Sequence, residues 1–362
     1  MEHVWWIAGA VVSLVALALA LVELRSKRKR MLAATLLGSA GAFLLVAGWL
    51  LAIDPGAPKH ETIKTGGLAG GAVVALYALW LNDRRRRVDE AKHELESQRA
   101  EHDRSRVADE RFAKSVELLG HDADQVRVGA MHAMAGLARS RPEYAQTVLD
   151  VLCAYLRRKP EVFEGEQREG QRREGDREQE VRLTAQRVVA DLLPAADAQD
   201  PPRYRLDLTD AHLRYFDLSH RAIGSLVMRG AVLTGSNSLH HAVFHGDVWL
   251  TGTGSAGELH LHDAVFRERA WFSGFRCDGP ASFERSKFLG PTKFADARFT
   301  GTVTFDGARF TGDADFRGAR FTGGVVLPTA LTAQAQGVRV SEEHANRLPE
   351  GWKVGPRGEV RS

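Results

Sequence analysis

Bulky side chains recur at a fixed spacing between residues 239 and 327. One series has a period of eleven residues and consists of Leu239, Leu250, Leu261, Phe272, Phe283, Phe294, Phe305, Phe316 and Leu327. A second series with the same period lies five residues behind it and consists of Phe244, Ser255, Phe266, Cys277, Phe288, Phe299, Phe310 and Phe321. The alternating steps of five and six fit neither the 3.6-residue period of a helix nor the two-residue period of a strand. Such a repeat is typical of a solenoid, whose units each bury one side chain and stack coil on coil.

A five-residue motif extends this pattern toward the N-terminus. From Leu208 to Leu233 the step between large apolar residues is five throughout, and Ala often stands two residues before the large one. The segments DAHLRYFDLS and DADFRGARFTG resemble pentapeptide-repeat proteins, whose unit is A(D/N)Lxx or its Phe variant. The resemblance implies a right-handed quadrilateral β-helix with four units per coil. We expect this fold over residues 204–328.

Four units of alternately five and six residues make a 22-residue coil, so residues 22 apart should share a column. One column is expected to contain Leu239, Leu261, Phe283, Phe305 and Leu327, and another Phe272, Phe294 and Phe316. With coils about 4.8 Å apart, roughly six coils give a rod about 30 Å long. Each buried Phe contributes roughly 1.5 to 3 kcal/mol, which is enough to drive the stacking.

Three apolar runs precede the repeat, at residues 4–22, 31–53 and about 66–81. The first two are long enough to cross a bilayer, and the third is short. Trp5, Trp6, Trp49 and Trp80 lie near the ends of these runs, where indole rings favour the membrane interface. We therefore expect residues 1–82 to form three transmembrane helices.

Basic residues set the expected orientation of these helices. Clusters of Lys and Arg follow the first run at residues 25–30 and the third at residues 84–87. The positive-inside rule places both clusters in the cytoplasm. We expect a multi-pass protein of the bacterial inner membrane, with the N-terminus outside and everything after Leu81 inside. A cleaved signal peptide is the alternative for the first run, but Met-Glu-His at the start of the chain carries no Lys or Arg.

Gly66, Gly67, Gly70 and Gly71 form two overlapping GxxxG pairs in the third run. Such pairs let helices approach closely, either to make a homo-oligomer or to pack helices of one chain together. The polar residues that we find within the runs are Ser13, Thr35 and Ser39, which gives little support to an ion pathway.

The segment between membrane and repeat is expected to be helical. Residues 83–111 are dense in charge and free of Gly and Pro, with a weak coiled-coil heptad at Val88, Ala91 and Leu95. In residues 112–200, DQVRVGAMHAMAGLA and EVRLTAQRVVADLL resemble HEAT-like or armadillo-like helices. They are expected to pack together as a cap on the first coil. Residues 165–179 have no apolar side chain and are expected to form a disordered loop.

The C-terminal segment, residues 329–362, is expected to cover the open end of the β-helix with Trp352 as a plug, because that end would expose strand edges.

The formal net charge of the 362-residue chain is only +3, and its two cysteines provide no disulfide framework. Cys277 falls in an inward column and is expected to be a buried thiol in a reducing compartment.

Motifs for chemistry are weak. GTGSAG at residues 252–257 matches GxGxxG, but a strand-like repeat segment follows it where a nucleotide site needs a helix. We find no catalytic triad, HExxH or phosphate loop, so neither an enzyme nor a cofactor is expected. His240, His260 and His262 lie on one expected face and are candidate zinc ligands; the alternative is a merely histidine-rich surface.

Basic residues also form expected outward columns, Arg276, Arg298 and Arg320 in one and Lys287 and Arg309 in another. These columns suit an acidic protein or anionic lipid, and the alternative is a solvated surface whose charges interdigitate with acidic neighbours. Some pentapeptide-repeat proteins are similar to duplex DNA in shape and acidity and bind gyrase. Residues 201–328 contain 15 Lys and Arg against 13 Asp and Glu, a net of +2, which is the wrong sign for DNA mimicry.

These features together predict a non-enzymatic scaffold, anchored in the lipid bilayer, that presents a β-helix to an unidentified cytoplasmic protein. No nucleic-acid partner is expected. The alternative is a membrane effector or sensor that oligomerises through its transmembrane helices, and a regulator that binds gyrase is a more remote one.

Overall fold

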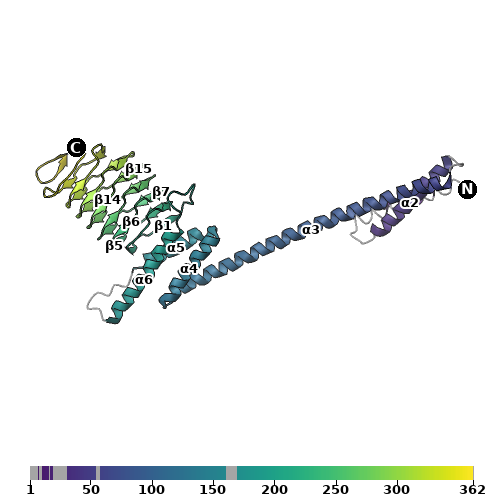
Figure 1. Ribbon diagram of the computed structural model, residues 1–362, viewed down its shortest axis with the longest axis horizontal. Helices are drawn as coiled ribbons and strands as arrows, with labels where there is room; N and C mark the ends of the chain where they lie inside the picture. The colour runs from purple at the N-terminus through teal and green to yellow at the C-terminus, as the bar shows by residue number, and fades with distance from the viewer. Residues whose placement is uncertain are drawn as a thin grey trace. The chain divides into compact units, whose positions relative to one another are not determined.

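The computed structural model describes residue 7 and residues 10–15, 17–18, 31–53, 58–159 and 169–361. The chain forms two compact units, Met1–Arg106 and Val107–Ser362. The described part of the first unit is helical, and the second combines helices with stacked short strands (Figure 1).

Two helices of the first unit are long and apolar enough to cross a membrane. They are α2 (Met31–Ile53) and the apolar part of α3 (Lys59–Leu119), with mean hydropathies of 2.1 and 1.3 over their best segments. Only 17% of the apolar window of each helix is buried. A core helix of a soluble protein buries most of such a surface, so the exposure of these windows fits a lipid environment.

Most of the predicted first span, residues 4–22, lies outside the described residues. Residues 10–15 and 17–18 are helical, and Ser13 lies against Gly41 of α2. Beyond the apolar part, α3 continues without a break through residues 83–111, as the charged sequence predicts, and is 61 residues long. Leu95 of the predicted heptad is 47% exposed, and the side chains of Val88 and Ala91 lie outside the described ones. The coiled coil therefore stays a prediction.

In the second unit the end of α3 is followed by three more helices and a short 3₁₀ turn. These are α4 (Asp124–Ser140), η1 (Pro142–Tyr144), α5 (Ala145–Arg157) and α6 (Glu169–Leu192). The two segments that resemble each other in sequence lie in α4 and α6, which contact one another. Their buried side chains include Met131, Met134, Ala185 and Val189, at the spacing of one helical face.

The prediction of a disordered loop at residues 165–179 is wrong for its C-terminal part. Residues 169–179 form the first turns of α6, while residues 165–168 lie outside the described residues. Glu, Gln and Arg are good helix formers. Residues 169–179 can therefore form an exposed first part of α6 without an apolar face, while the later part of the helix packs against the core from Val181 onward.

The helices cover the first coil of the solenoid, and polar side chains complete its open strand edge. The amide of Gln146 on α5 exchanges two hydrogen bonds with the backbone of Arg205, at 2.8 and 2.9 Å. The guanidinium of Arg182 on α6 is 2% exposed and donates to the carbonyls of Leu156, Arg158 and His212. The bonds to Arg205 and His212 satisfy groups of the first coil that an uncapped edge would leave unpaired, and those to Leu156 and Arg158 satisfy carbonyls at the C-terminal end of α5.

Four parallel sheets form the faces of the solenoid. Sheet I has the order β1-β4-β8-β12-β16-β20-β23, with strands Arg205–Asp207, Ser225–Val227, Val248–Trp249, Ala270–Trp271, Thr292–Lys293, Ala314–Asp315 and Ala333–Gln334. Sheet II has the order β2-β5-β9-β13-β17-β21-β24, with strands His212–Arg214, Val232–Thr234, Gly254–Ser255, Arg276–Cys277, Arg298–Phe299, Arg320–Phe321 and Arg339–Val340.

The other two faces are shorter. Sheet III contains β6-β10-β14-β18-β22, with strands Asn237–Ser238, Leu259–His260, Ala281–Ser282, Val303–Thr304 and Val325–Val326. Sheet IV contains β3-β7-β11-β15-β19, with strands Ala222–Ile223, Val243–Phe244, Val265–Phe266, Lys287–Phe288 and Arg309–Phe310. Figure 1 shows these strands stacked in successive coils toward the C-terminus.

The predicted 22-residue register is confirmed in the middle coils, where Ala270 pairs with Thr292 and Lys287 with Arg309. The predicted columns also stack. The ring centroids of Phe283 and Phe305 are 4.6 Å apart, and the nearly parallel rings of Phe272, Phe294 and Phe316 follow one another at 4.6 and 5.0 Å. Each of these rings is fully buried, so the core is a set of aromatic ladders rather than a mixed interior.

The ring of Phe275 occupies core space beside two inward positions of sheet II that have small side chains. Ser255 and Cys277 stand on adjacent coils of sheet II, where the other inward residues are larger. Phe275 is fully buried, and its ring centroid lies 5.9 Å from those of both Phe272 and Phe299. Its bulk replaces the volume that two short side chains would leave empty, and a void there would cost stability.

The solenoid extends past residue 328. Strands β23 and β24 continue sheets I and II in a shortened coil, in which Ala314 pairs with Ala333 and Arg320 with Arg339. An antiparallel hairpin follows, formed by β25 (Lys353–Val354) and β26 (Val360–Arg361). Trp352 is partly buried against the core, so it lies at this end as expected.

Candidate functional site

The arginines predicted to share an outward column do so on sheet II. Arg276 pairs in register with Arg298, and Arg298 with Arg320. The column gains a fourth member, Arg339, on the last coil. Backbone hydrogen bonds of 2.7 to 2.9 Å from each of these four residues to the preceding coil fix the spacing of the side chains. We call Arg276, Arg298, Arg320 and Arg339 the arginine column.

Within the described residues, the first three guanidinium groups of the arginine column have no carboxylate within 4.0 Å. All four side chains are exposed, and only Arg339 has an acidic partner, Glu359, at 3.6 Å. Like charges on adjacent coils repel by about 1 kcal/mol or less per pair in water, and salt screens this repulsion. An anionic partner that reaches several guanidinium groups would remove the repulsion and gain charge-assisted hydrogen bonds.

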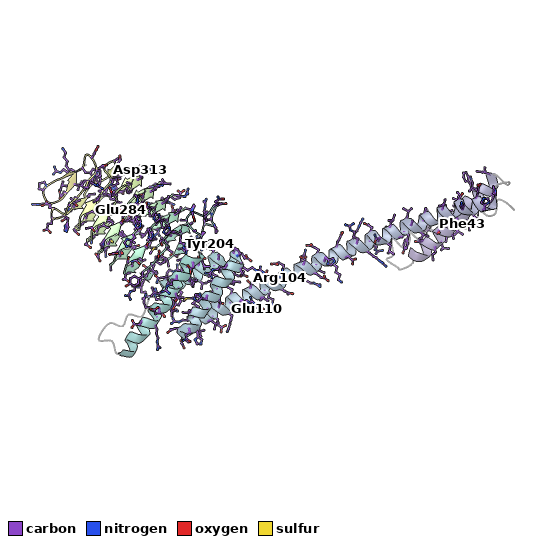
Figure 2. The ribbon with its side chains drawn as sticks, viewed as in Figure 1. Phe43, Arg104, Glu110, Tyr204, Glu284 and Asp313 are labelled. Carbon is purple, nitrogen blue, oxygen red and sulfur yellow. The ribbon has the colours of Figure 1, made fainter. Side chains whose placement is uncertain are left out.

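A shorter basic pair lies on sheet IV. Lys287 and Arg309 are in register and exposed, and Val265 precedes them in the same column. Acidic side chains are already used nearby: Arg347 donates to Asp306, and Glu284, labelled in Figure 2, lies 3.5 Å from Arg285. Neither Lys287 nor Arg309 has a carboxylate within 4.0 Å in the described part of the chain, so the column of sheet II differs from this pair in its length.

The predicted histidines lie together, and the structure enlarges the cluster. His240 and His262 stack with ring centroids 4.7 Å apart, and the ring of His260 lies 6.2 Å from that of His262. His260 Nε2 also lies 3.3 Å from Glu258 and 3.1 Å from the Ser236 hydroxyl. The structure adds His220 and His241, whose rings are stacked 4.7 Å apart, and Asp263. These residues lie at one corner of consecutive coils.

Burial and mutual repulsion affect two of these histidines. The pKa of His240 is lowered by burial, and then by the neighbouring imidazoles of His262, His220 and His241. Burial also lowers the pKa of His262, against the opposing effect of Asp263. Both imidazoles therefore stay neutral at pH 7, with nitrogen lone pairs available.

Two tryptophans on the outer face of sheet I were not singled out from the sequence. Trp249 and Trp271 are in register, with ring centroids 4.2 Å apart. The guanidinium of Arg229 lies 4.3 Å from the Trp249 ring, and the ammonium of Lys293 lies 4.6 Å from the Trp271 ring. The 22-residue spacing of the tryptophans is the signal that would have found them. Such cation–π contacts order a surface that combines aromatic area with positive charge.

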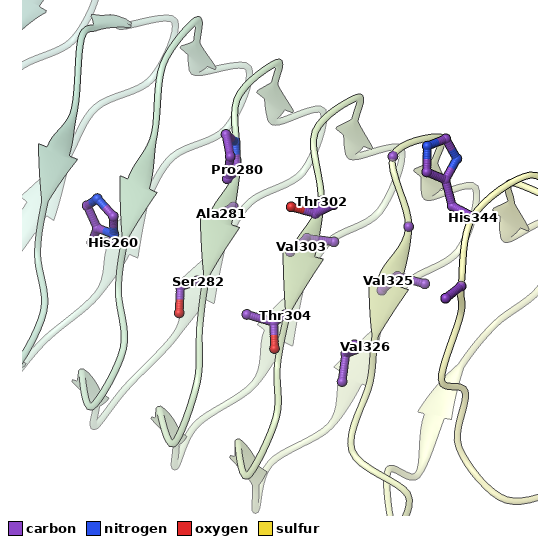
Figure 3. A pocket seen from close by; sticks show the side chains of 13 residues that line it. His260, Pro280, Ala281, Ser282, Thr302, Val303, Thr304, Val325, Val326 and His344 are labelled. Atoms are coloured by element: carbon purple, nitrogen blue, oxygen red, sulfur yellow. The ribbon is translucent and has the colours of Figure 1, made fainter.

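A shallow groove of about 310 Å³ runs over the outer face of sheet III. Its floor contains small side chains, Ser282, Thr304 and Val326, one from each successive coil (Figure 3). His260 and His344 lie at its two ends (Figure 3). The groove is mostly apolar and runs across successive coils, so it suits an extended chain better than a compact polar ligand.

The four glycines of α3 divide into two pairs. A Cβ on Gly66 would come within 3.1 Å of Ala47 and Phe43 of α2, and one on Gly70 within 3.0 Å of the Ser39 carbonyl. Phe43 is labelled in Figure 2. The Ser39 hydroxyl also donates a 2.9 Å hydrogen bond to the Gly70 carbonyl. A Cβ on Gly67 or Gly71 would meet nothing within 4 Å among the described atoms. Gly66 and Gly70 thus pack helices of the same chain together.

The literal GxGxxG segment belongs to the solenoid. Gly254 and Ser255 form β9 of sheet II, and Gly252 occupies a turn with φ of +69°. A Cβ on Gly257 would overlap the backbone of Gly235 on the preceding coil. Gly252 therefore serves a turn and Gly257 the close approach of two coils, and no helix follows them in the described segment.

A polar cluster between α4, α5 and α6 has a structural role. Arg127 lies 2.5 Å from Asp124 and from Glu178, and it donates a 3.0 Å hydrogen bond to the Tyr155 hydroxyl. Burial, followed by the negative charge of Glu178, raises the pKa of Tyr155 to about 12. A neutral tyrosine that bridges an arginine and a carboxylate fixes the helices but provides no reactive group at pH 7.

Comparison with known proteins agrees with the architecture of the C-terminal half. Residues 283–327 match the family model described as pentapeptide repeats (9 copies). No curated protein and no solved structure shows significant similarity to the chain. The matched segment lies entirely within the β-solenoid, across the coils that carry most of the phenylalanine ladders.

Proposed function

We propose that this protein is a non-enzymatic scaffold, anchored in the inner membrane of a bacterium, whose solenoid binds an acidic protein in the cytoplasm. Three helices cross the membrane in this proposal, at residues 4–22, 31–53 and within the apolar part of α3. The N-terminus lies outside, and everything after Leu81 lies inside.

Helix composition and charge support the anchor. The described apolar windows leave most of their surface exposed, and in water such surface would be costly. Two apolar runs lie between the basic clusters at residues 25–30 and 84–87. If both runs cross the membrane, the two clusters lie on the same side of it, as the positive-inside rule expects. This pattern requires α2 and the apolar part of α3 to span in opposite directions. The contacts of Gly66 with Ala47 and of Gly70 with Ser39 have this antiparallel order.

The arginine column is the observation that carries the binding role. Three guanidinium groups that have no carboxylate within 4.0 Å in the described residues are held in register on a solenoid whose ends are covered by other segments of the chain. An aligned row of guanidinium groups matches carboxylates spaced along a partner, and such pairs are stronger than neutral hydrogen bonds. Because the backbone is fixed by coil-to-coil hydrogen bonds, little conformational entropy of the backbone is lost on binding.

Crosslinking and affinity purification from membranes test this role. We expect a recurrent acidic protein with the wild-type chain and at least a tenfold smaller yield with Arg298→Glu. The matched control is Arg309→Glu, which reverses an equally exposed arginine on sheet IV and should keep the partner. Equal recovery with both variants, or no recurrent partner with the wild type, would contradict the proposal.

A second candidate function is an effector or sensor that oligomerises in the membrane. The exposed pair Gly67 and Gly71 favours it, because a second helix can approach that side of α3 closely. This candidate predicts that Gly71→Ile abolishes a crosslinked homo-oligomer while partner recovery is unchanged. It also predicts ion leakage when the wild-type chain is expressed, which the scaffold alone does not.

A further inference from the structure

On four consecutive coils, the corner that follows sheet III carries an ionisable side chain whose backbone has a positive φ. These residues are His220 at 57°, His241 at 54°, Asp263 at 57° and Arg285 at 55°. The backbone N–H of His241 donates to the His262 carbonyl at 3.0 Å, and that of Asp263 to the Glu284 carbonyl at 2.8 Å. These hydrogen bonds hold neighbouring corners at the spacing of the coils.

Three side chains of this corner bring ligand atoms together. A nitrogen of His241, a nitrogen of His262 and a carboxylate oxygen of Asp263 all lie within 4.8 Å of one another. His241 Nε2 and Asp263 Oδ2 are 3.8 Å apart. Tetrahedral ligands at about 2.1 Å from a zinc ion are about 3.4 Å apart, so small side-chain rotations close the site. The side chain of His241 is 46% exposed, which leaves room for that movement.

From this geometry we infer a site for a divalent transition-metal ion of the zinc class, with His241, His262 and Asp263 as ligands. Two imidazoles and one carboxylate favour Zn²⁺ over Mg²⁺ or Ca²⁺, which prefer oxygen ligands. The fourth tetrahedral position is left to water. This site is independent of the arginine column.

Neighbouring side chains fit the roles of outer partners in a metal site. The guanidinium of Arg285 donates to both oxygens of Asp263, at 2.9 and 2.6 Å, and so orients the carboxylate. Each carboxylate oxygen keeps another lone pair for a metal. His240 stacks on His262 with an angle of 10° between the rings, which restricts rotation of that ligand. Groups that orient the ligands in this way usually contribute to metal affinity.

Arg285 also places a limit on the site. Its positive charge repels a cation held by the same carboxylate, and the other basic groups near the ligands are His220, His240 and His260. The two imidazoles must therefore supply most of the binding, and the affinity is expected to depend more on His241 and His262 than on Asp263. This order separates a real site from a carboxylate that collects metal ions non-specifically.

The test uses the full-length chain, purified in detergent without a histidine tag and treated with a chelator. Zn²⁺ is titrated by calorimetry, and Co²⁺ is added separately to record the visible absorption of a four-coordinate ion. We expect one Zn²⁺ per chain and at least a tenfold loss of affinity in His241→Asn and in His262→Gln. Asparagine readily adopts a positive φ, so His241→Asn keeps the corner and removes only the imidazole.

His220→Asn is the matched control, because His220 has the same backbone conformation on the other side of the His241 ring. The His220 ring stacks on the His241 ligand but is not one of the three ligands, so His220→Asn should lose clearly less Zn²⁺ affinity than His241→Asn and keep the Co²⁺ spectrum. Thermal unfolding without metal verifies that each variant is folded. The proposed site is overturned if the wild type binds no Zn²⁺, if His241→Asn binds as well as the wild type, or if His220→Asn loses as much affinity as His241→Asn.

Discussion

The side-chain amide of Gln146 forms a reciprocal pair of hydrogen bonds with the backbone N–H and carbonyl of Arg205. A neighbouring strand would make the same two bonds, so the amide replaces the missing coil below β1. The pair joins the helical part of the second unit to its solenoid. It also prevents β1 from pairing with another chain.

Removal of this amide should destabilise the second unit. We expect Gln146→Ala to lower the free energy of unfolding by about 0.5 to 1.5 kcal/mol, because both hydrogen bonds are exposed and water replaces part of what they contribute. Denaturant unfolding followed by tryptophan fluorescence measures the change. Gln98→Ala, which removes an exposed amide of α3 bonded to Glu94, is the control and should change stability by less than about 0.5 kcal/mol.

The phenylalanine ladder predicts a large effect of one core substitution. Phe294 is fully buried between Phe272 and Phe316, and its ring lies edge-on to Phe283 and Phe305. Phe294→Ala should cost about 3 to 5 kcal/mol, since it leaves a cavity among rings fixed on adjacent coils. Leu289→Ala truncates a side chain that is 44% exposed and should cost far less. A small loss for Phe294→Ala, measured by denaturant unfolding, would mean that the coils are not tightly packed.

The two cysteines should resist alkylation in the folded protein. Burial raises the pKa of Cys153 to about 12 and that of Cys277 to about 11, from an ordinary value of 9.0. The thiolate is the reactive form, so both residues should label with iodoacetamide at pH 8 only after unfolding, as mass spectrometry would show. Rapid labelling of Cys277 in the native protein would contradict its inward position.

The same shift gives a pH dependence of stability. The pKa of Cys277 is raised in the folded state, so folding favours the protonated thiol. This contribution is fully present below pH 9 and is lost as the pH rises through about 11. Cys277→Ala should therefore lose less stability than the wild type between pH 8.5 and pH 10.5, as compared by denaturant unfolding. An identical pH dependence in both proteins would contradict the burial of the thiol.

Packing within the first unit can be tested by disulfide formation. A Cβ on Gly66 would lie 3.1 Å from the Cβ of Ala47, close to the spacing in a disulfide. Oxidation of the Ala47→Cys, Gly66→Cys double variant should give an intramolecular disulfide. The Ala47→Cys, Gly67→Cys variant should not, because a Cβ on Gly67 would have no atom of Ala47 within 4 Å. Equal yields for the two variants, read as the loss of free thiols, would contradict the assignment of the helix faces.

The solenoid could be predicted from the sequence because each inward position is occupied by the same kind of residue at a fixed interval along the chain. Residues such as Phe272 and Phe294 recur at one spacing, and that spacing alone places them in one column. Arg339 was missed because the last coil is three residues shorter, so that it follows Arg320 by 19 rather than 22. A deletion in a coil changes the spacing in the sequence but leaves the register in space.

The histidine corner was predicted only in part for a similar reason. His240 and His262 are 22 residues apart and were found from that spacing. His241 follows His240 directly in the sequence, and the turn of the backbone at this corner brings its side chain close to His262 as well. The positive φ of His241 and Asp263 produces this turn, and a periodic pattern carries no information about φ at a non-glycine residue.

The wrong prediction at residues 169–179 has another cause, since charged sequences occur both in exposed helices and in disordered loops.

Site-specific photo-crosslinking in cells can show whether the arginine column on sheet II binds an acidic cytoplasmic protein. A photoreactive amino acid is placed at Thr300, an exposed position directly after the strand that contains Arg298, or at Leu289, an exposed position beside sheet IV. We expect one dominant adduct with an acidic cytoplasmic protein from position 300 in the membrane fraction, and a much weaker one from position 289. The absence of an adduct at position 300, or equal adducts at both positions, would contradict this binding.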